Sequence, residues 1–172
     1  ILNKNFVTKY FRDVDVVHHL AGITSVPRTK NESNEIADNK IKLVAEEGTQ
    51  NILDVISNKC KIIFPSTHVV YEGIKEVKKD IIEDEITQPI LSYATSKAIN
   101  ENQLKKSGKN YVILRLGSVY GYSTDTARID IMPNLFSKIS SQNGTLKLFS
   151  GGRQLKSLVP LIDVARCFKF ME

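Results

Sequence analysis

Short runs of apolar residues recur along the chain and predict the strands of a buried sheet. Three of these runs end in small or polar residues: "VDVVHHLAG" (14–22), "KIIFPST" (61–67) and a run within "NYVILRLGSVYG" (110–121). Their apolar residues are nearly continuous instead of alternating with polar ones. That pattern is typical of strands covered on both faces.

Longer and more polar segments lie between these runs and have the spacing of helices. Within 32–57, the apolar residues at helical intervals are Ile41, Val44, Ile52 and Ile56. The segment 92–106 follows Pro89 and ends before Gly108, which predicts a helix between two breakers. Strands that alternate with helices predict parallel βαβ units and a three-layer α/β sandwich.

The last part of the chain is expected to contain shorter elements. They are a helix over 129–141, a strand "TLKLF" (145–149), a strand in "SLVPL" (157–161) and a helix that begins near Asp163. We find no internal repeat, low-complexity segment or linker. At 172 residues the chain has the size of one ordinary domain.

Composition narrows the class of protein. The chain is 41% hydrophobic and 25% charged, as in a soluble globular protein, and no apolar run approaches the roughly 20 residues of a membrane span. Cys60 and Cys167 lie far apart without metal-ligand spacing, which predicts reduced thiols, a cytoplasmic protein and no metal site. The net charge of +5 comes from dispersed lysines, so no nucleic-acid partner is expected.

Small and polar residues follow the predicted strands, at the edge of a parallel sheet where ligands bind. They are Ala21 and Gly22, Ser66 and Thr67, and Gly117 and Ser118. The predicted helix between the second and third strands begins with "SYATSK", which places Tyr93 and Lys97 on one face. Alone, this pair is more typical of a surface helix with a half-buried tyrosine and a solvated lysine.

Five motifs that follow one another along the chain indicate a functional role for Tyr93 and Lys97. They are "HLAG", "FPSTHVVYEG", "EDEITQPILSYATSK", "LRLGSVYG" and "GGRQLKSLVPLIDVA". From Asp13 onward the chain resembles the extended short-chain dehydrogenase/reductases, and within them the NAD-dependent nucleotide-sugar epimerase/dehydratase family. The resemblance implies a Rossmann-like, doubly wound parallel sheet. It also implies a dinucleotide-binding part over 1–128 and a partial substrate-binding region with a return helix over 129–172.

The family's glycine-rich phosphate loop has no counterpart in this sequence. Family members open with a strand, G-x-x-G-x-x-G and a helix, whereas this chain begins with "ILNKNFV". The resemblance places that start near the fourth strand. We therefore expect a sheet that is incomplete at its amino-terminal end by at least one βαβ unit of roughly 30 residues. The substrate domain is expected to be cut short after "DVARCFKFME".

Carried over residue by residue, the resemblance makes Tyr93 the catalytic acid/base, Lys97 its partner and Thr67 the catalytic hydroxyl. A tyrosine with an ordinary pKa of about 10 is a poor base at neutral pH. A nearby ammonium and the positive nicotinamide ring stabilise the phenolate and lower that pKa. Thr67 is expected to bond the same sugar hydroxyl, and Lys97 to hold the cofactor ribose as well. Hydride would pass between the sugar and the nicotinamide while Tyr93 moves the proton.

The resemblance also assigns binding residues. The expected contacts to the dinucleotide are Leu20, Ala21, Gly22, Ser66, Tyr93, Lys97 and Leu116. Small residues in this set permit close approach. The expected contacts to a nucleotide-diphosphate sugar are His68, Ser118 and Lys156. Ser118 stands in place of a common asparagine. Lys156 stands in place of an arginine and keeps its charge without the bidentate fork.

Other positions depart from the family or are expected to be structural. Ala45 replaces the usual asparagine three residues before a glycine of the helix motif. The family's "VYG" reads Val-Tyr-Glu here, with Glu72 in place of the glycine and Gly73 after it. His18 and His19, on the first strand, are expected to pack in the core or at the sheet edge instead of taking part in catalysis.

The implied activity is that of an NAD-dependent nucleotide-sugar epimerase or oxidoreductase that acts through a transient keto-sugar, with NADP as the other candidate cofactor. A homodimer is expected, and no membrane is expected as a partner. Two alternatives stay open. A catalytically silent dinucleotide-binding sensor or scaffold would have no need for Thr67, Tyr93 and Lys97 together. An NADP-dependent reductase of a non-sugar carbonyl would keep all three.

Dehydration is not expected. Family members that eliminate water across C5–C6 of the sugar use an acidic pair directly after the catalytic threonine. One carboxylate takes the C5 proton and the other protonates the leaving hydroxyl. Related decarboxylases keep a glutamate at the second position. Here these positions are His68 and Val69, so epimerisation or simple reduction is favoured.

Overall fold

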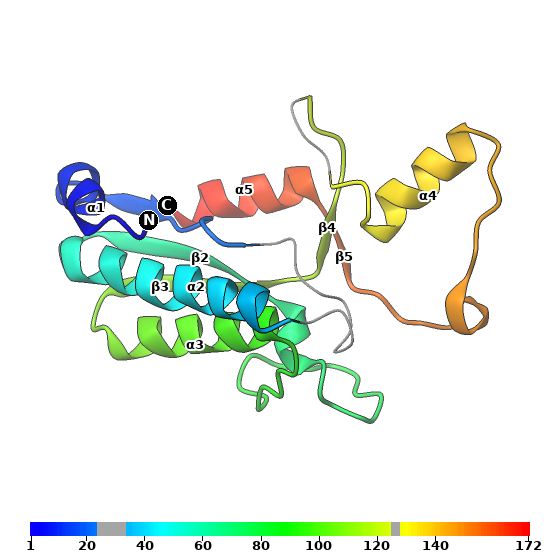
Figure 1. The fold of residues 1–172 in the computed structure, drawn as a ribbon, viewed down its shortest axis with the longest axis horizontal. Helices are drawn as coiled ribbons and strands as arrows, with labels where there is room; N and C mark the ends of the chain where they lie inside the picture. Colours follow the sequence, from blue (N-terminus) through cyan, green and yellow to red (C-terminus); the bar gives the residue numbers. More distant parts are fainter. Residues whose placement is uncertain (24–33, 125–127) are drawn as a thin grey trace. The chain divides into compact units, whose positions relative to one another are not determined.

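The computed structural model describes residues 1–23, 34–124 and 128–172, and the chain divides into two compact units (Figure 1). The first unit contains residues 1–115 together with Glu172, and the second contains residues 116–171. The sequence predicts a different boundary, between residues 128 and 129, which would separate a cofactor-binding region from a substrate-binding region. That functional boundary stays a prediction.

A three-stranded sheet forms the centre of the first unit. Its strand order is β1 (Val16–His18), β2 (Lys61–Thr67) and β3 (Asn110–Leu116). The first two strands are parallel, with Val17 opposite Ile62. β2 lies between the others and most of its residues are buried. The strand predicted over 61–67 is therefore confirmed at both ends, and the parallel pairing predicted for the first two strands is confirmed as well.

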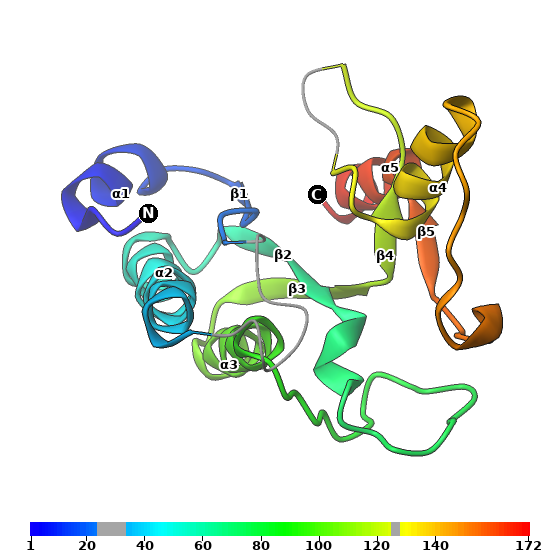
Figure 2. The same ribbon diagram turned by 45° about the vertical axis from the view of Figure 1, so that its right-hand side comes forward.

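Two long helices connect these strands and lie next to each other on the same side of the sheet (Figure 2). They are α2 (Glu35–Val55), which Asn34 caps through its side chain, and α3 (Ser92–Lys106). The predicted bounds of α3 are confirmed. The helix predicted within 32–57 is confirmed over the range of α2, while residues 32 and 33 lie outside the described residues.

A short helix that the hydrophobic pattern did not predict, α1 (Lys4–Phe11), packs against α2. Its signal was present in the sequence. Asn3 accepts a hydrogen bond from the amide of Phe6 as an N-cap. Val7 and Phe11 follow four residues apart on one face, and both contribute to the core.

One apolar core joins the helices to the sheet. Its buried members are Val7, Val17, Ile52, Leu53, Ile56, Cys60, Ile62, Phe64 and Leu104. Fully burying a side chain of this kind stabilises a fold by roughly 1.5–3 kcal/mol. Because Phe64 comes from β2 and Leu104 from α3, the core fixes these two elements against each other.

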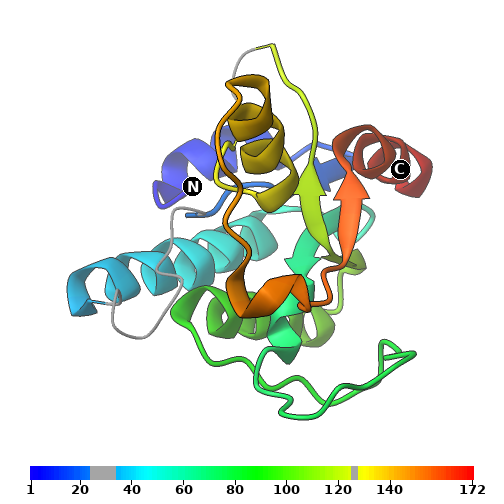
Figure 3. The same cartoon turned by 90° about the vertical axis from the view of Figure 1, so that its right-hand side faces the viewer.

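The second unit contains a parallel strand pair, β4 (Ser118–Tyr120) and β5 (Leu158–Pro160), which Figure 3 shows side by side. Its helices are α4 (Met132–Ser141) and α5 (Leu161–Met171). The strand predicted in 157–161 and both helices are confirmed with shifted ends. α4 begins three residues later than predicted, because Pro133 favours the first turn of a helix.

The strand predicted over 145–149 is wrong. Residues 145–148 are irregular, and the 3-10 turn η3 (Phe149–Gly152) follows them. Gly151 and Gly152 both have positive φ, at +65° and +72°, which turns the chain. The strand partner of β4 is β5 instead. None of the helices in the described ranges is long and apolar enough to cross a membrane.

Candidate active site

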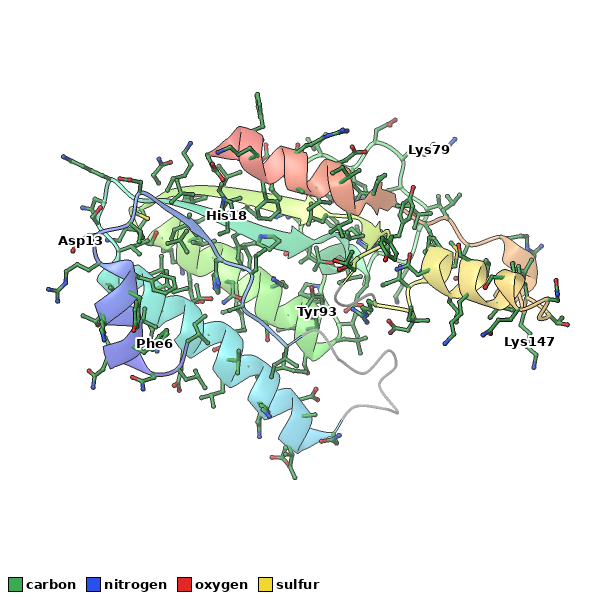
Figure 4. All side chains as sticks on the ribbon, turned by 90° about the horizontal axis from the view of Figure 1, so that it is seen from above. Phe6, Asp13, His18, Lys79, Tyr93 and Lys147 are labelled. Carbon is green, nitrogen blue, oxygen red and sulfur yellow. The ribbon has the colours of Figure 1, made fainter. Side chains whose placement is uncertain are left out.

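The predicted catalytic residues lie on two elements of the first unit that the core holds together. Thr67 is the last residue of β2, and Tyr93 is the second residue of α3. Figure 4 labels Tyr93 at this end of the helix. Lys97 follows one helical turn later on the same face. The spacing inferred from the sequence therefore holds in the structure.

The side chain of Lys97 lies against β2. Its Nζ atom donates a 2.7 Å hydrogen bond to the carbonyl oxygen of Pro65. The same atom lies 4.4 Å from the ring centroid of Phe64 and 5.9 Å from that of Tyr93. The structure thus brings Lys97 and Tyr93 together and excludes a solvated surface lysine at this position.

Burial of Lys97 lowers its pKa to about 8, against an opposing effect of the Glu101 carboxylate. The lysine is therefore mostly protonated at pH 7. A cation held next to a phenol favours the phenolate, so this arrangement can assist proton transfer by Tyr93.

Thr67 ends its strand in a defined geometry. Its hydroxyl oxygen accepts a 3.3 Å hydrogen bond from the amide of Val69 and caps the 3-10 turn η2 (His68–Tyr71). A hydroxyl that accepts a backbone amide keeps its own O–H group as a donor. Thr67 can therefore still donate to a ligand oxygen. His68, the half-buried first residue of η2, directly follows it.

A buried polar network lies behind Ser66. The Ser66 hydroxyl donates to Glu101 at 2.5 Å, and Arg115 donates to the same carboxylate at 2.6 Å. Arg115 also donates to the Tyr71 hydroxyl and to the Glu83 carbonyl. Burial acts to raise the pKa of Glu101, but the hydrogen bonds from Arg115 and Ser66 outweigh it and lower that pKa. Ser66 as a cofactor contact stays a prediction.

Neither Glu101 nor Arg115 was singled out from the sequence, although signals existed. Glu101 is four residues after Lys97, on the same helical face. Arg115 is a single charge within an apolar strand, and buried charges are paired. These two signals mark each residue as a candidate for pairing, but neither signal identifies the partner.

The segment predicted to approach a dinucleotide follows β1. Leu20 is 65% exposed, Ala21 is exposed, and an added Cβ at Gly22 would have no atom within 4 Å. Leu20 and Ala21 also line an apolar cavity of about 180 Å³. That volume is below the roughly 300–1,000 Å³ of ligand pockets, so this cavity is too small for a dinucleotide, and the roles of Leu20, Ala21 and Gly22 stay predictions.

The two histidines predicted to pack in the core or at the sheet edge are the last residue of β1, His18, and the residue after it, His19. His18, at the edge of the sheet, lies 3.3 Å from a carboxylate oxygen of Glu172. His19 is buried, and its Nε2 atom lies 2.8 Å from the Thr49 hydroxyl. Burial, and then the charge of Lys97, lower the pKa of His19 to about 4. His19 is therefore neutral at pH 7.

Three predicted ligand contacts belong to the second unit. Leu116 is its first residue, Ser118 opens β4, and Lys156 is exposed before β5. Their assigned roles stay predictions. Among the described residues, no group of three or more His, Cys, Asp or Glu side chains could hold a metal ion.

Comparison with known proteins gives one family. Residues 1–171 match the family described as the NAD dependent epimerase/dehydratase family. A curated relative is the UDP-N-acetyl-alpha-D-glucosaminuronate decarboxylase of Bacillus cytotoxicus. The two sequences are 30% identical over an alignment of 173 residues, gaps included. The alignment covers 95% of this chain and 51% of the relative. The resemblance inferred from the motifs is confirmed.

Two solved structures are similar in fold. The UDP-glucuronic acid 4-epimerase of Bacillus cereus, in complex with UDP-glucuronic acid and NAD, is 25% identical with a TM-score of 0.74. The similarity covers 95% of this chain and 51% of that one. A dTDP-glucose 4,6-dehydratase of Streptomyces venezuelae, with NAD bound, is 22% identical with a TM-score of 0.76, covering 97% and 51%. The Rossmann-like α/β fold is thereby confirmed, and the chain spans about half the length of these relatives.

Lowering the pH from 7 to 5 is expected to destabilise the fold through His19. Its pKa is about 4 in the folded chain and 6.5 when unperturbed. Between these values the unfolded chain binds a proton that the folded chain does not, so stability falls as the pH falls. The free energy of unfolding, measured with urea, should drop by about 2 kcal/mol from this residue.

The control variants are His19→Gln and His18→Gln. The first should lose this share of the pH dependence, and the second should keep it. The same decrease between pH 7 and pH 5 in wild type and His19→Gln would contradict the assignment.

Proposed function

Since the chain belongs to the NAD-dependent epimerase/dehydratase family, we propose that its protein is an NAD-dependent nucleotide-sugar epimerase or oxidoreductase. The observation that carries the proposal is the position of Lys97, bonded to Pro65 of β2 and 5.9 Å from the Tyr93 ring. A silent scaffold would gain nothing from a desolvated lysine beside a tyrosine. The expected homodimer and the expected cytoplasmic location belong to the same proposal.

The residues of the first unit fit the family's dinucleotide. Leu20 and Ala21 offer an exposed segment after β1, and Gly22 leaves open space beside its backbone. Lys97 offers a cation with N–H donors beyond the one used by Pro65. NAD, when bound, supplies the acceptor and donor of hydride. The similar epimerase from Bacillus cereus is described in complex with NAD.

Tyr93 is proposed to move the proton of the reaction. As a sugar hydroxyl becomes a carbonyl, Tyr93 takes the hydroxyl proton, and it returns the proton when the carbonyl is reduced. Lys97 favours the phenolate by its charge, which it keeps below a pKa of about 8. Thr67 donates its hydroxyl hydrogen to the same sugar oxygen and orients it.

The residues after Thr67 favour epimerisation or reduction over loss of water. His68 and Val69 form the start of η2, where an acidic pair would be needed for elimination. Valine carries no ionisable group, and one histidine would have to serve as both acid and base. The same valine disfavours decarboxylation, because related decarboxylases keep a glutamate there. The known relatives include an epimerase, a dehydratase and a decarboxylase, so this preference depends on residues 68 and 69 of this chain.

Substitution of Tyr93 by phenylalanine is expected to lower turnover by roughly 100-fold or more, the scale of general acid–base catalysis. The assay uses the complete natural protein with a nucleotide sugar. NAD should still bind, because only the phenol oxygen is removed and the other expected contacts remain. Tyr111→Phe, at the exposed start of β3, is the matched control and should remain active. Near-normal turnover in Tyr93→Phe would overturn the assignment of proton transfer to Tyr93.

Incubation of the complete protein with a panel of nucleotide hexoses is expected to give a product of unchanged mass. Epimerisation inverts one centre and conserves every atom, whereas dehydration removes one water. Chromatography separates an epimer from the unreacted nucleotide sugar, and mass spectrometry of the separated products distinguishes epimerisation from dehydration. Accumulation of a product lighter by one water would contradict the preference based on His68 and Val69.

A further inference from the structure

Glu72 stands where the resemblance places a glycine, and its carboxylate has specific partners. One oxygen, Oε1, accepts hydrogen bonds from the amides of Ile90 and Leu91, at 2.7 Å and 2.6 Å. Hydrogen bonds to an ionised carboxylate are stronger than those between neutral groups. Glu72 therefore ties the residue that follows η2 to the two residues that precede α3.

The start of α3 needs an acceptor from elsewhere in the chain. Leu91 is the N-cap residue, and its apolar side chain makes no capping hydrogen bond. The first amides of a helix have no partner within the helix, and a negative charge near this end is favourable. The carboxylate of Glu72 supplies an acceptor for the amide of the N-cap residue Leu91 and a negative charge close to this end of the helix.

The backbone forms the rest of the same connection. The amide of Gln88 donates to Val70 O and the amide of Gly73 donates to Gln88 O, both at 2.8 Å. A Cβ on Gly73 would lie 2.5 Å from that Gln88 oxygen, so only glycine permits this approach. The order Glu72–Gly73 is thus explained. The glutamate bonds the segment before α3, and the displaced glycine makes room for it.

These four hydrogen bonds join the segment after Thr67 to the segment before Tyr93. Thr67 is five residues before Glu72, and Tyr93 is two residues after Leu91. We infer that Glu72 is a positioning residue, an inference that rests on the proposed function. Glu72 fixes the start of α3, and therefore Tyr93, relative to Thr67. Small displacements of catalytic groups can cost up to about 100-fold in rate.

The test compares variants of the complete natural protein. Glu72→Ala removes the acceptor, Glu72→Gln keeps an oxygen at the same place, and Glu76→Ala removes an exposed carboxylate of the same loop. With the nucleotide hexose that the wild type converts, kcat of Glu72→Ala should fall roughly 10-fold or more. KM for NAD should stay within about 2-fold. Glu72→Gln should recover most of kcat, and Glu76→Ala should match the wild type.

Amide hydrogen exchange separates positioning from general stability. In Glu72→Ala the amides of Ile90 and Leu91 should exchange faster, while that of the core residue Leu104 should be unchanged. The inference is overturned if Glu72→Ala keeps full kcat, if Glu72→Gln recovers none, or if Leu104 exchanges faster to the same degree.

The two proposals fail in different ways. Full kcat in Glu72→Ala together with an inactive Tyr93→Phe overturns only the positioning role. Near-normal turnover in Tyr93→Phe overturns the proton-transfer role of Tyr93, and the positioning role of Glu72 with it, while a wild type that converts no nucleotide sugar overturns the proposed function itself.

Discussion

The ammonium group of Lys97 donates a hydrogen bond to the carbonyl oxygen of Pro65, and this bond joins the helix that carries Tyr93 to the strand that carries Thr67. It holds a charged group out of water, which is costly in free energy, and the lowered pKa of Lys97 records that cost. The Phe64 ring at 4.4 Å and the Glu101 carboxylate partly offset it. A lysine without a chemical role would be more stable in solvent.

Apolar packing and hydrogen bonds surround this bond. The core packs Phe64 of β2 and Leu104 of α3 into one cluster. On the polar side, Glu101 accepts hydrogen bonds from Ser66 and Arg115 and so connects α3 to β2 and β3. Reactive groups held by packed helices and strands keep their geometry better than groups held by loops alone.

The elements that carry the site were predictable because their signals are local. The apolar run 61–67 marks a buried strand, and two breakers delimit the helix 92–106. Pairings distant in sequence were not predictable. The strand expected over 145–149 would need a neighbouring strand to pair with, and the hydrophobic pattern does not identify one. Arg115 meets Glu101 from fourteen residues away, and Glu72 meets Leu91 from nineteen. The roles of Ser118 and Lys156 depend on a ligand and stay predictions.

The protonation of Lys97 tests the central claim most directly. A titration of lysine side chains by carbon-13 NMR can be made on this chain, with a Lys97→Met variant to assign the signal. Burial against β2 predicts a midpoint at about 8, well below the roughly 10.4 of a lysine side chain in water. A Lys97 midpoint at about 10.4 would contradict the account, because it would place the ammonium in solvent and away from Pro65.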